Sequence, residues 1–202
     1  MKEIEEGRLT LRFAVGWNAI KWDADASKGD APPYLYREGI EKLNGELDGR
    51  AESTKAVDVV ASPPEPLLVL IEIKDFRSTS TGEGARFLAA GGRWRELPLE
   101  IALKVRDTLA GVYGTVHLGT ASQIAWLRAA LHAGARIVAL VPQDADRPRE
   151  PRAKRVARDD EMLRSLRRRL AWLTRDPHHI AVIDRLDGSF PHWLDGLSIT
   201  ST

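Results

Sequence analysis

The chain has 202 residues, 43% of them hydrophobic, and carries a formal net charge of +1. This length favours a single domain, residues 1–202, with ample apolar content for a core. The near-neutral charge gives no global signal for nucleic-acid binding, and the absence of cysteine excludes disulfides, thiolate catalysis and cysteine-ligated zinc.

The N-terminal region begins with charged residues, and two short segments of predicted secondary structure follow. Residues 1–6 do not form a secretory signal, and no run reaches the roughly 20 apolar residues of a membrane helix, so we expect a cytoplasmic protein without membrane contact. Residues 8–15 alternate loosely and predict a strand. Residues 16–23 suit a strand or a helical turn. As a strand they place Lys21 and Asp23 on one face, where the two either line a site or form a surface pair, and we favour the surface pair.

A loop, a helix and a polar connection come next in the chain. Residues 24–33 are rich in loop-forming residues, and residues 48–55 are polar. Between them, residues 34–47 place leucines and an isoleucine at near-helical spacing. This pattern predicts a helix, with charged residues on several of its sides.

Two apolar runs that contain charges form the centre of the sequence. Residues 56–61 (AVDVVA) and 67–77 (LLVLIEIKDFR) each read as a strand. The segment between them, residues 62–66 (SPPEP), can only form a turn or a short loop. We therefore expect the two strands to pair antiparallel as a hairpin.

Three of the charged side chains in this hairpin, Asp58, Glu72 and Lys74, are candidates for a common site. Glu72 and Lys74 are two positions apart, so they share one face of their strand, and Ile71 and Ile73 point to the other face. If Asp58 pairs opposite Glu72, both carboxylates and the lysine meet on one face, whereas a slip of one residue sends Asp58 to the other face. Buried charges are costly unless they are paired or bound to an ion. Two adjacent carboxylates would favour a divalent cation with oxygen ligands, Mg²⁺ or Mn²⁺.

The pattern of Asp58, a spacer and Glu72-x-Lys74 resembles the Asp…(Glu/Asp)-x-Lys signature of the restriction-endonuclease-like superfamily of phosphodiesterases. The segments KAVDVVA and LIEIKDFR also resemble small bacterial members of this superfamily, although Val57 stands where the family usually has proline. The resemblance covers residues 34–142. It implies an α/β fold with an αβββαβ core, in which helices flank a mixed central sheet.

The resemblance also implies roles for individual residues. Asp58 and Glu72 would bind Mg²⁺ or Mn²⁺, and Lys74 would orient or help deprotonate the attacking water. The helix predicted before the hairpin corresponds to the first core helix of the family, which often adds an acidic ligand. Here that residue would be Glu38 or Glu41, although solvation of an exposed side chain explains either one better.

The charged end of the hairpin also has a simpler explanation. A salt bridge from Glu72 to Lys74 or to Arg77 would account for the same residues without a metal. The metal site is the interpretation we favour, because the strand, turn and strand around the motif match the context that such a motif needs.

A long loop and a helix follow the hairpin. Residues 78–92 are rich in serine, threonine and glycine, and either cover a substrate or form a surface excursion. Residues 97–114 predict a helix with an apolar stripe. In the resembled fold this helix packs against the site, and we expect Lys104 to contact a phosphate or Glu72, held by Asp107 through an i, i+3 contact. An ordinary exposed ion pair explains Lys104 and Asp107 equally well.

The remaining elements complete the sheet. Residues 121–132 predict a helix, and residues 136–141 predict a buried strand that is parallel to the second hairpin strand through a helical crossover. Residues 180–183 predict a last strand, and residues 187–202 a tail folded back on the body. The two adjacent histidines before the last strand receive no role, because a metal site needs further ligands.

Composition shifts in a C-terminal extension of about residues 143–202. Residues 143–157 are rich in proline and arginine, and residues 159–175 predict a helix with leucines on one face and basic residues in its later part. This local basic excess either binds a phosphate backbone through sequence-independent contacts or forms an ordinary solvated face. The side chains that we expect at nucleic acid are Arg152, Lys154, Arg155, Arg158, Arg167 and Arg168.

Two functions are open at this point. The first is a nuclease that depends on Mg²⁺ or Mn²⁺ and cleaves DNA, which we favour, or RNA, with Asp58, Glu72, Lys74 and Lys104 as its catalytic residues. The second is a non-catalytic module of the same fold that binds nucleic acid or a protein partner within a larger defence or modification assembly. Both functions are compatible with a homodimer or with a subunit of a larger complex.

Overall fold

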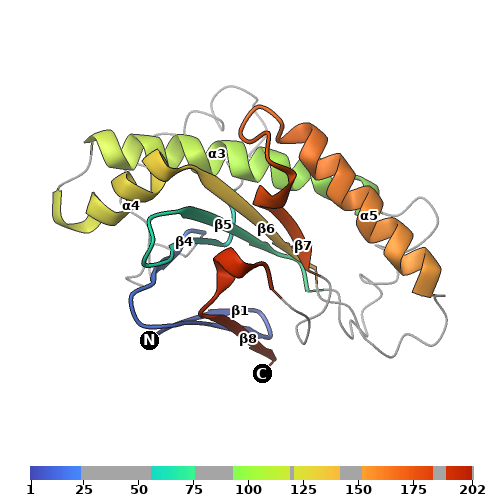
Figure 1. Ribbon diagram of the computed structural model, residues 1–202, viewed down its shortest axis with the longest axis horizontal. Coiled ribbons are helices and arrows are strands. Elements are labelled where there is room, and N and C mark those ends of the chain that lie inside the picture. The colour runs from blue at the N-terminus through green and yellow to red at the C-terminus, as the bar shows by residue number, and fades with distance from the viewer. Residues whose placement is uncertain (24–55, 76–92, 119–120, 142–151, 184–189, 202) are drawn as a thin grey trace, which may run out of the picture.

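A computed structural model describes residues 1–23, 56–75, 93–118, 121–141, 152–183 and 190–201. Within these ranges the protein is α/β, with three α-helices and two β-sheets. Figure 1 shows three layers: the helices, a five-stranded sheet below them, and a three-stranded sheet below that. The predictions for residues 24–33, 34–47 with Glu38 and Glu41, 48–55 and 78–92 lie outside the described residues.

The five-stranded sheet is mixed. Its spatial order is β3-β4-β5-β6-β7, in which β4 is antiparallel to both of its neighbours, β3 and β5, and β5, β6 and β7 are parallel. The predicted hairpin and the predicted parallel crossover are therefore confirmed, and the segment that suited a strand or a helical turn contains a strand. The strands are β3 (Asn18–Lys21), β4 (Val59–Ser62), β5 (Leu68–Ile73), β6 (Ala135–Leu140) and β7 (Ile180–Ile183).

Both faces of this sheet are covered, so its central strand β5 is buried at every position. Leu70 belongs to the core beneath the helices, and Ile71 belongs to the core above the three-stranded sheet. A strand buried on both faces needs an apolar residue at nearly every position, which explains the continuous apolar run. Glu72 is two positions after Leu70, so its side chain points to the same face of the sheet, the face that the helices cover.

The three helices are α3 (Leu97–Leu118), α4 (Ala121–Ala133) and α5 (Arg152–Arg169). α3 and α4 together form the crossover between β5 and β6. None of the described helices is both long enough and apolar enough to span a bilayer. The described residues also contain three short 3-10 turns: η3 (Arg93–Arg95), η4 (Pro177–His179) and η5 (His192–Leu194).

The boundaries predicted for the C-terminal helix are wrong. α5 begins at Arg152 rather than at residue 159, and it ends at Arg169 rather than at residue 175. The first turn contains arginine, alanine and lysine, which are strong helix formers, so the helix starts before the acidic residues that we took for its beginning. The leucine face is confirmed, because Leu166 and Leu170 are fully buried.

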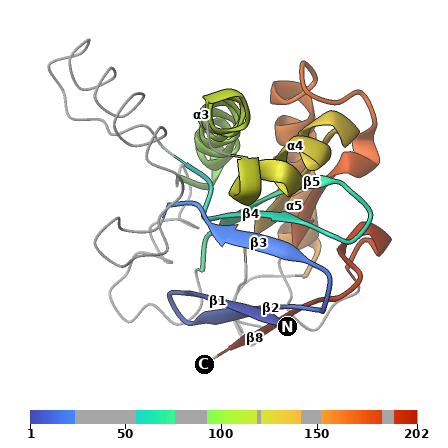
Figure 2. The ribbon, with the colours of Figure 1, turned by 90° about the vertical axis from the view of Figure 1, so that its left-hand side faces the viewer.

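The three-stranded sheet joins the two ends of the chain. Its antiparallel order is β1-β2-β8, formed by β1 (Lys2–Glu6), β2 (Leu9–Phe13) and β8 (Leu197–Ser201). The tail is thus folded back as predicted, and Figure 2 shows both termini in this sheet beneath β3. β1 was not predicted, because Ile4 is its one buried residue and charged edge strands give a weak pattern.

Candidate active site

The register of the hairpin places Asp58 opposite Glu72. β4 pairs Val59 with Ile71 and Val60 with Leu70, and the next step of this antiparallel register brings Asp58 across from Glu72. This is the register that puts both carboxylates on one face of the sheet, and Lys104 of α3 contacts both of them there. The sequence had left this alternative open against a slip of one residue.

Glu72 is the most deeply buried charged side chain of the site, with 1% of its surface exposed. Lys104 Nζ donates to Glu72 Oε1 at 2.7 Å, and Lys74 Nζ lies 3.3 Å from the same oxygen. Within the described part of the chain, Glu72 Oε2 is buried and has no hydrogen-bond partner. Buried polar atoms are nearly always paired, so this oxygen is an atom whose bonding a ligand would complete.

Asp58 lies just before β4 and is held through its side chain and its backbone. Its Oδ2 accepts a short hydrogen bond from the backbone N–H of Ile73, and its Oδ1 is 4.0 Å from Lys104 Nζ. Its backbone carbonyl accepts the N–H of Trp22 at 2.8 Å, and a carboxylate oxygen of Asp23 lies within 4.8 Å of one of its own. These contacts bring the end of β3 into the site.

The electrostatics of the site disfavour its negative charges. Burial, followed by the charge of Glu72, raises the pKa of Asp58 to about 8, against the opposing effect of Lys104. Burial likewise raises the pKa of Glu72, against Lys104 and Lys74. The two lysines therefore do not fully compensate the carboxylates, and an added cation would favour the ionised forms.

The surroundings of Lys74 favour its charged form, in contrast to those of the buried carboxyl groups. Burial alone would lower its pKa, but the charges of Glu72 and Glu100 outweigh burial, and the pKa is raised. Its Nζ lies 2.9 Å from a carboxylate oxygen of Glu100. Lys74 therefore stays an ammonium, held between two glutamates at a partly exposed position.

The residues present fit a divalent cation. Asp58 and Asp23 supply carboxylate oxygens that lie close together, the ligands that Mg²⁺ and Mn²⁺ prefer. Glu72 is not part of this close group of carboxylates, but it adds a buried oxygen without a hydrogen-bond partner among the described residues. Oxygen atoms of Glu6, Asp23 and Asp58 also lie within 4.8 Å of one another. Glu6 is already compensated, because Lys21 Nζ is 2.6 Å from it, so we regard it as peripheral to the site.

Lys21 and Asp23 lie at the end of β3, next to β1 and to the start of β4. Lys21 pairs with Glu6 and donates to the carbonyl of Glu5 at 3.0 Å, both on β1. Asp23 is exposed and lies near both the Lys21 charge and Asp58, so the predicted surface pair and a place at the site both stay predictions for this residue.

Helix α3 contributes three polar residues at intervals of four. Lys104 contacts Glu72, as expected, but Asp107 does not serve it in the way we expected: its carboxylate pairs with Arg106 at 2.7 Å. Glu100 and Thr108 were not predicted to take part in the site. The signal that could have found them is their spacing of one helical turn on either side of Lys104.

The basic residues predicted to bind nucleic acid are not equivalent. Lys154 and Arg168 are exposed on α5. Arg158 is only 7% exposed and lies 3.5 Å from Asp159, so its burial argues against a phosphate contact. Arg167 Nε donates to the carbonyl of Pro177 at 3.1 Å. The side chains of Arg152 and Arg155 lie outside what the structure describes.

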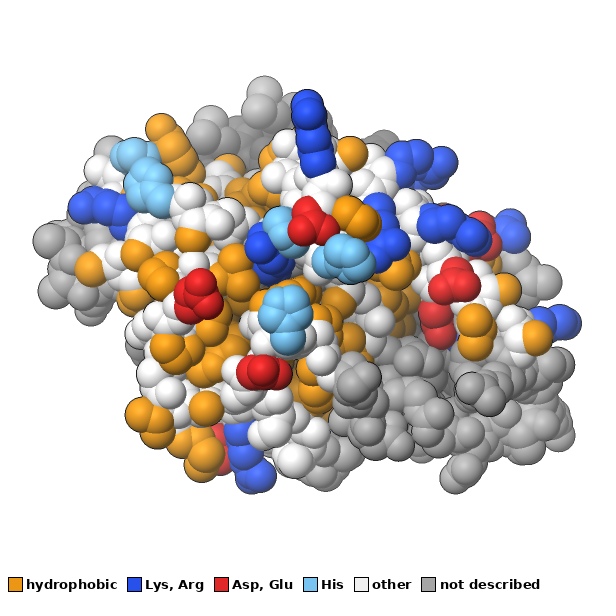
Figure 3. Space-filling view, in the orientation of Figure 1, with side chains coloured by type: hydrophobic (Ala, Val, Ile, Leu, Met, Phe, Trp, Pro, Cys, Tyr) orange, Lys and Arg blue, Asp and Glu red, His pale blue; other side chains and the backbone are white. Residues whose placement is uncertain are grey.

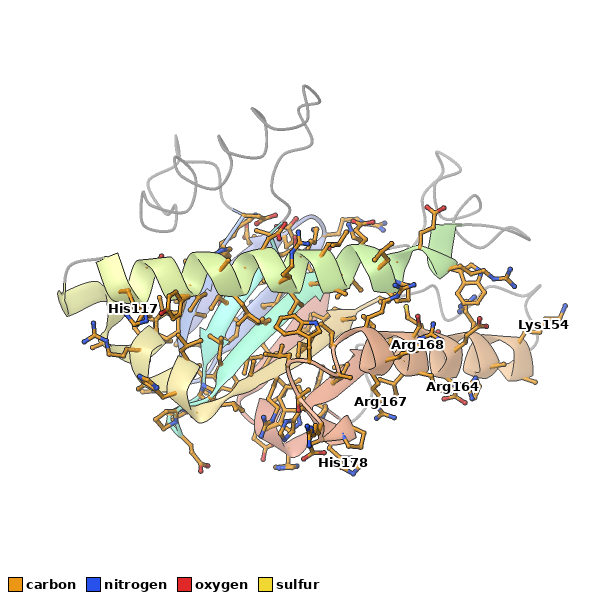
Figure 4. All side chains as sticks on the ribbon, turned by 90° about the horizontal axis from the view of Figure 1, so that it is seen from above. His117, Lys154, Arg164, Arg167, Arg168 and His178 are labelled. Carbon is orange, nitrogen blue, oxygen red and sulfur yellow. The ribbon has the colours of Figure 1, made fainter. Side chains whose placement is uncertain are left out.

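Helix α5 packs against α3 and on β7, away from the strands that carry Asp58 and Glu72. Figure 3 shows lysine and arginine side chains gathered over α5 with acidic side chains among them. Figure 4 shows the labelled basic residues of α5, on the opposite side of α3 from β3. α5 packs on β7, three strands away from β4. The basic surface and the acidic cluster therefore lie toward opposite edges of the sheet.

The structure thus brings together four predicted catalytic residues, Asp58, Glu72, Lys74 and Lys104, and adds Asp23 to them. Comparison with known proteins gives no further identification: no protein-family model, no curated protein and no solved structure matches this chain.

Proposed function

We propose that the protein is a phosphodiesterase that depends on Mg²⁺ or Mn²⁺ and cleaves nucleic acid. The observation that carries this proposal is the pairing of Asp58 opposite Glu72, with Lys74 and Lys104 on the same face and one oxygen of Glu72 unpaired. Uncompensated charge at the end of a buried strand conflicts with stability, and such conflicts are typical of functional sites.

The topology supports a restriction-endonuclease-like core. Three antiparallel strands, β3, β4 and β5, are followed by a helical crossover to the parallel strand β6. This is the order expected for the later part of an αβββαβ core, apart from the position of residues 34–47, which lie between β3 and β4 in the chain and outside the described residues. The superfamily assignment is therefore part of the proposal.

In the proposed reaction, Asp58, Glu72 and Asp23 would hold the cation. When bound, the cation lowers the pKa of a water molecule and offsets the charge that builds on the phosphate. Lys74, held by Glu100 at the partly exposed end of β5, would orient the attacking water and stabilise negative charge. Lys104 would keep the inner oxygen of Glu72 compensated throughout.

The exposed basic residues of α5 would bind the phosphate backbone beside the reacting group. Because α5 packs on β7, three strands away from β4, it suits nucleic acid flanking the cleaved position rather than the cleaved phosphate itself. Binding should weaken as salt rises, and Lys154→Ala should reduce the slope of log affinity against log salt by about 1. Affinity that does not change with salt would contradict a role for this surface.

A second candidate function has its own observation. Lys104 contacts both Asp58 and Glu72, so the protein already places one cation between the two carboxylates. A closed ion-pair network of this kind suits a non-catalytic module that keeps the fold and binds nucleic acid or a protein partner, alone as a dimer or within a larger assembly.

The test compares variants of the site with matched variants elsewhere. Glu72→Gln should abolish Mn²⁺ binding, measured by titration calorimetry, and cleavage of single-stranded DNA, duplex DNA and RNA. Lys74→Ala should retain most Mn²⁺ affinity and lose cleavage. Glu65→Gln and Lys2→Ala remove the same charges from exposed positions and should behave as the parent protein does.

Two results would count against the proposal. Equal loss of Mn²⁺ affinity in Lys74→Ala and Glu72→Gln would contradict the separation of their roles. A parent protein that binds nucleic acid but neither binds Mn²⁺ nor cleaves any of the three substrates would favour the non-catalytic module.

A further inference from the structure

Helix α3 presents one polar stripe to the ends of β4 and β5. Residues four apart lie on one helix face, so the stripe reaches three successive points of the site. Its first two members contact charged side chains, whereas the third contacts the backbone. The three contacts are Glu100 with Lys74 at 2.9 Å, Lys104 with Glu72 at 2.7 Å, and Thr108 with the N–H of Val57 at 3.0 Å.

The Thr108 side chain provides a hydrogen-bond acceptor for a buried backbone N–H. β4 begins at Val59, so the N–H of Val57 lies outside the ladder of the sheet, and Val57 is fully buried. A buried N–H needs a partner, and Thr108 Oγ1 accepts it. Thr108 is itself fully buried, so water has no access to replace it.

This contact fixes the backbone on one side of Asp58. On the other side, the N–H of Trp22 holds the carbonyl of Asp58 at 2.8 Å. The carboxylate, held in this way, accepts the N–H of Ile73 and faces Lys104. Loss of the Thr108 hydroxyl would leave a buried N–H without its partner and release the segment that carries the carboxylate.

We propose that Thr108 is a positioning residue that holds the Asp58 carboxylate in place opposite Glu72. Its effect on metal binding rests on the proposed function, whereas its effect on the geometry of Asp58 does not. Residues that orient a metal ligand typically change metal affinity by about 10–100-fold when they are substituted.

The same helix provides a matched control. Thr115 is also fully buried on α3, and within the described part of the chain its Oγ1 has no hydrogen-bond partner. Thr115→Val therefore makes the same chemical change in the same helix without removing a contact to the site. Thr108→Ser is the second control, because it keeps a hydroxyl at the position.

The experiment measures two properties of the full chain. The first is the hydrogen-exchange rate of the Ile73 backbone amide, which reports on its hydrogen bond to Asp58. It is expressed as a ratio to the exchange rate of a backbone amide in β6, so that a change in global stability cancels. The second is Mn²⁺ affinity. Thr108→Val should raise this ratio of exchange rates at least tenfold and weaken Mn²⁺ binding about 10-fold or more. Thr115→Val and Thr108→Ser should stay within about twofold of the parent in both properties. If Thr108→Val does not fold, Thr108→Ala makes the same test with a smaller side chain.

The outcomes are separable. Unchanged exchange at Ile73 in folded Thr108→Val or Thr108→Ala overturns the positioning role, and so does an equal increase in Thr115→Val. If the parent chain binds no Mn²⁺, the proposed function fails, and the exchange rate of Ile73 still decides the role of Thr108.

Discussion

The polar clusters around Glu72 and around His179 differ in how completely their hydrogen bonds and ion pairs are formed. Beneath α3, Glu72 is almost fully buried, with two ammonium groups near one oxygen and no partner for the other among the described residues. At the turn before β7, His179 is partly exposed and both of its ring nitrogens are paired. Its Nε2 lies 2.9 Å from Asp176, and its Nδ1 lies 2.8 Å from Arg136 and 2.7 Å from Thr174.

The cluster around His179 connects several elements, and both ring nitrogens of the histidine have partners. The turn of residues 174–179 also receives a hydrogen bond from Arg167 of α5 to Pro177, and one from Trp193 to the carbonyl of His178. Its contacts thus connect α5, β6 and the C-terminal region. The comparison shows that a dense polar cluster is not by itself evidence of chemistry; the informative feature here is an almost fully buried carboxylate that lies beside a second carboxylate and has one oxygen unpaired.

The largest effect should follow from removing the counter-ion of Glu72. Lys104→Met leaves a carboxylate buried beside Asp58 with Lys74 alone nearby, and breaking a buried pair in this way costs roughly 3–5 kcal/mol of unfolding free energy. Urea unfolding measures the loss. Glu72→Gln in the Lys104→Met background should recover much of it, because it removes the uncompensated charge.

The control for this prediction is Lys154→Met, which removes an exposed lysine from α5 and should change stability by less than about 0.5 kcal/mol. A Lys104→Met protein as stable as the parent would mean that Glu72 is compensated by other groups, and the contrast between the two clusters would be lost.

The next effect concerns the pH dependence of stability. The pKa of Asp58 is raised from its ordinary value of 3.8 to about 8, so between these values the folded chain keeps a proton that the unfolded chain releases. Asp58 therefore makes stability fall as pH rises from about 4 to about 8, with no further loss above that range. Asp58→Asn should be as stable as the parent near pH 4 and more stable near pH 8, as measured by urea unfolding at each pH.

Asparagine keeps an oxygen that can accept the N–H of Ile73, so this variant tests charge rather than the loss of a hydrogen bond. The control is Asp195→Asn, at an exposed position, where no such difference is expected. An Asp58→Asn protein that is less stable than the parent at pH 8 would show that the ionised carboxylate is favoured, contrary to the site described above.

The core of the candidate site was predictable because it depends on local rules. The period of two fixes Glu72 and Lys74 on one face of β5, and the proline-rich turn forces the hairpin. The register that places Asp58 opposite Glu72 could be stated only as an alternative, since a slip of one residue gives an equally regular hairpin. The apolar residues of the core on both faces of the sheet decide between the two.

The rest of the site arises from contacts distant in sequence. Asp23 reaches Asp58 because β3 pairs with β4 across a long intervening segment, and Thr108 reaches Val57 because α3 packs on the end of the hairpin. No local pattern marks a threonine as the partner of a particular backbone N–H. The early start of α5 was missed for a different reason, because proline and arginine were weighed as loop signals although arginine favours helices.

The smallest effect belongs to the paired cluster. Burial, followed by the charge of Arg136, lowers the pKa of His179, while Asp176 opposes this effect. The folded chain therefore resists protonation of His179, and its contribution to stability is complete above the ordinary pKa of 6.5 and is lost as pH falls below that value. Protonation would place an N–H at Nδ1, which accepts from Arg136, and this bond between β6 and the turn would break.

His179→Gln should therefore flatten the decline in stability between about pH 6.5 and pH 5, measured by urea unfolding in steps of pH. Thr174→Val should cost about 1 kcal/mol at neutral pH, the ordinary net value of one hydrogen bond. The two clusters would then differ in sign as well as in size: acidification stabilises the fold through Asp58 and destabilises it through His179. If His179→Gln leaves the decline unchanged, the turn before β7 does not sense this proton, and the acid-side loss must come from other groups.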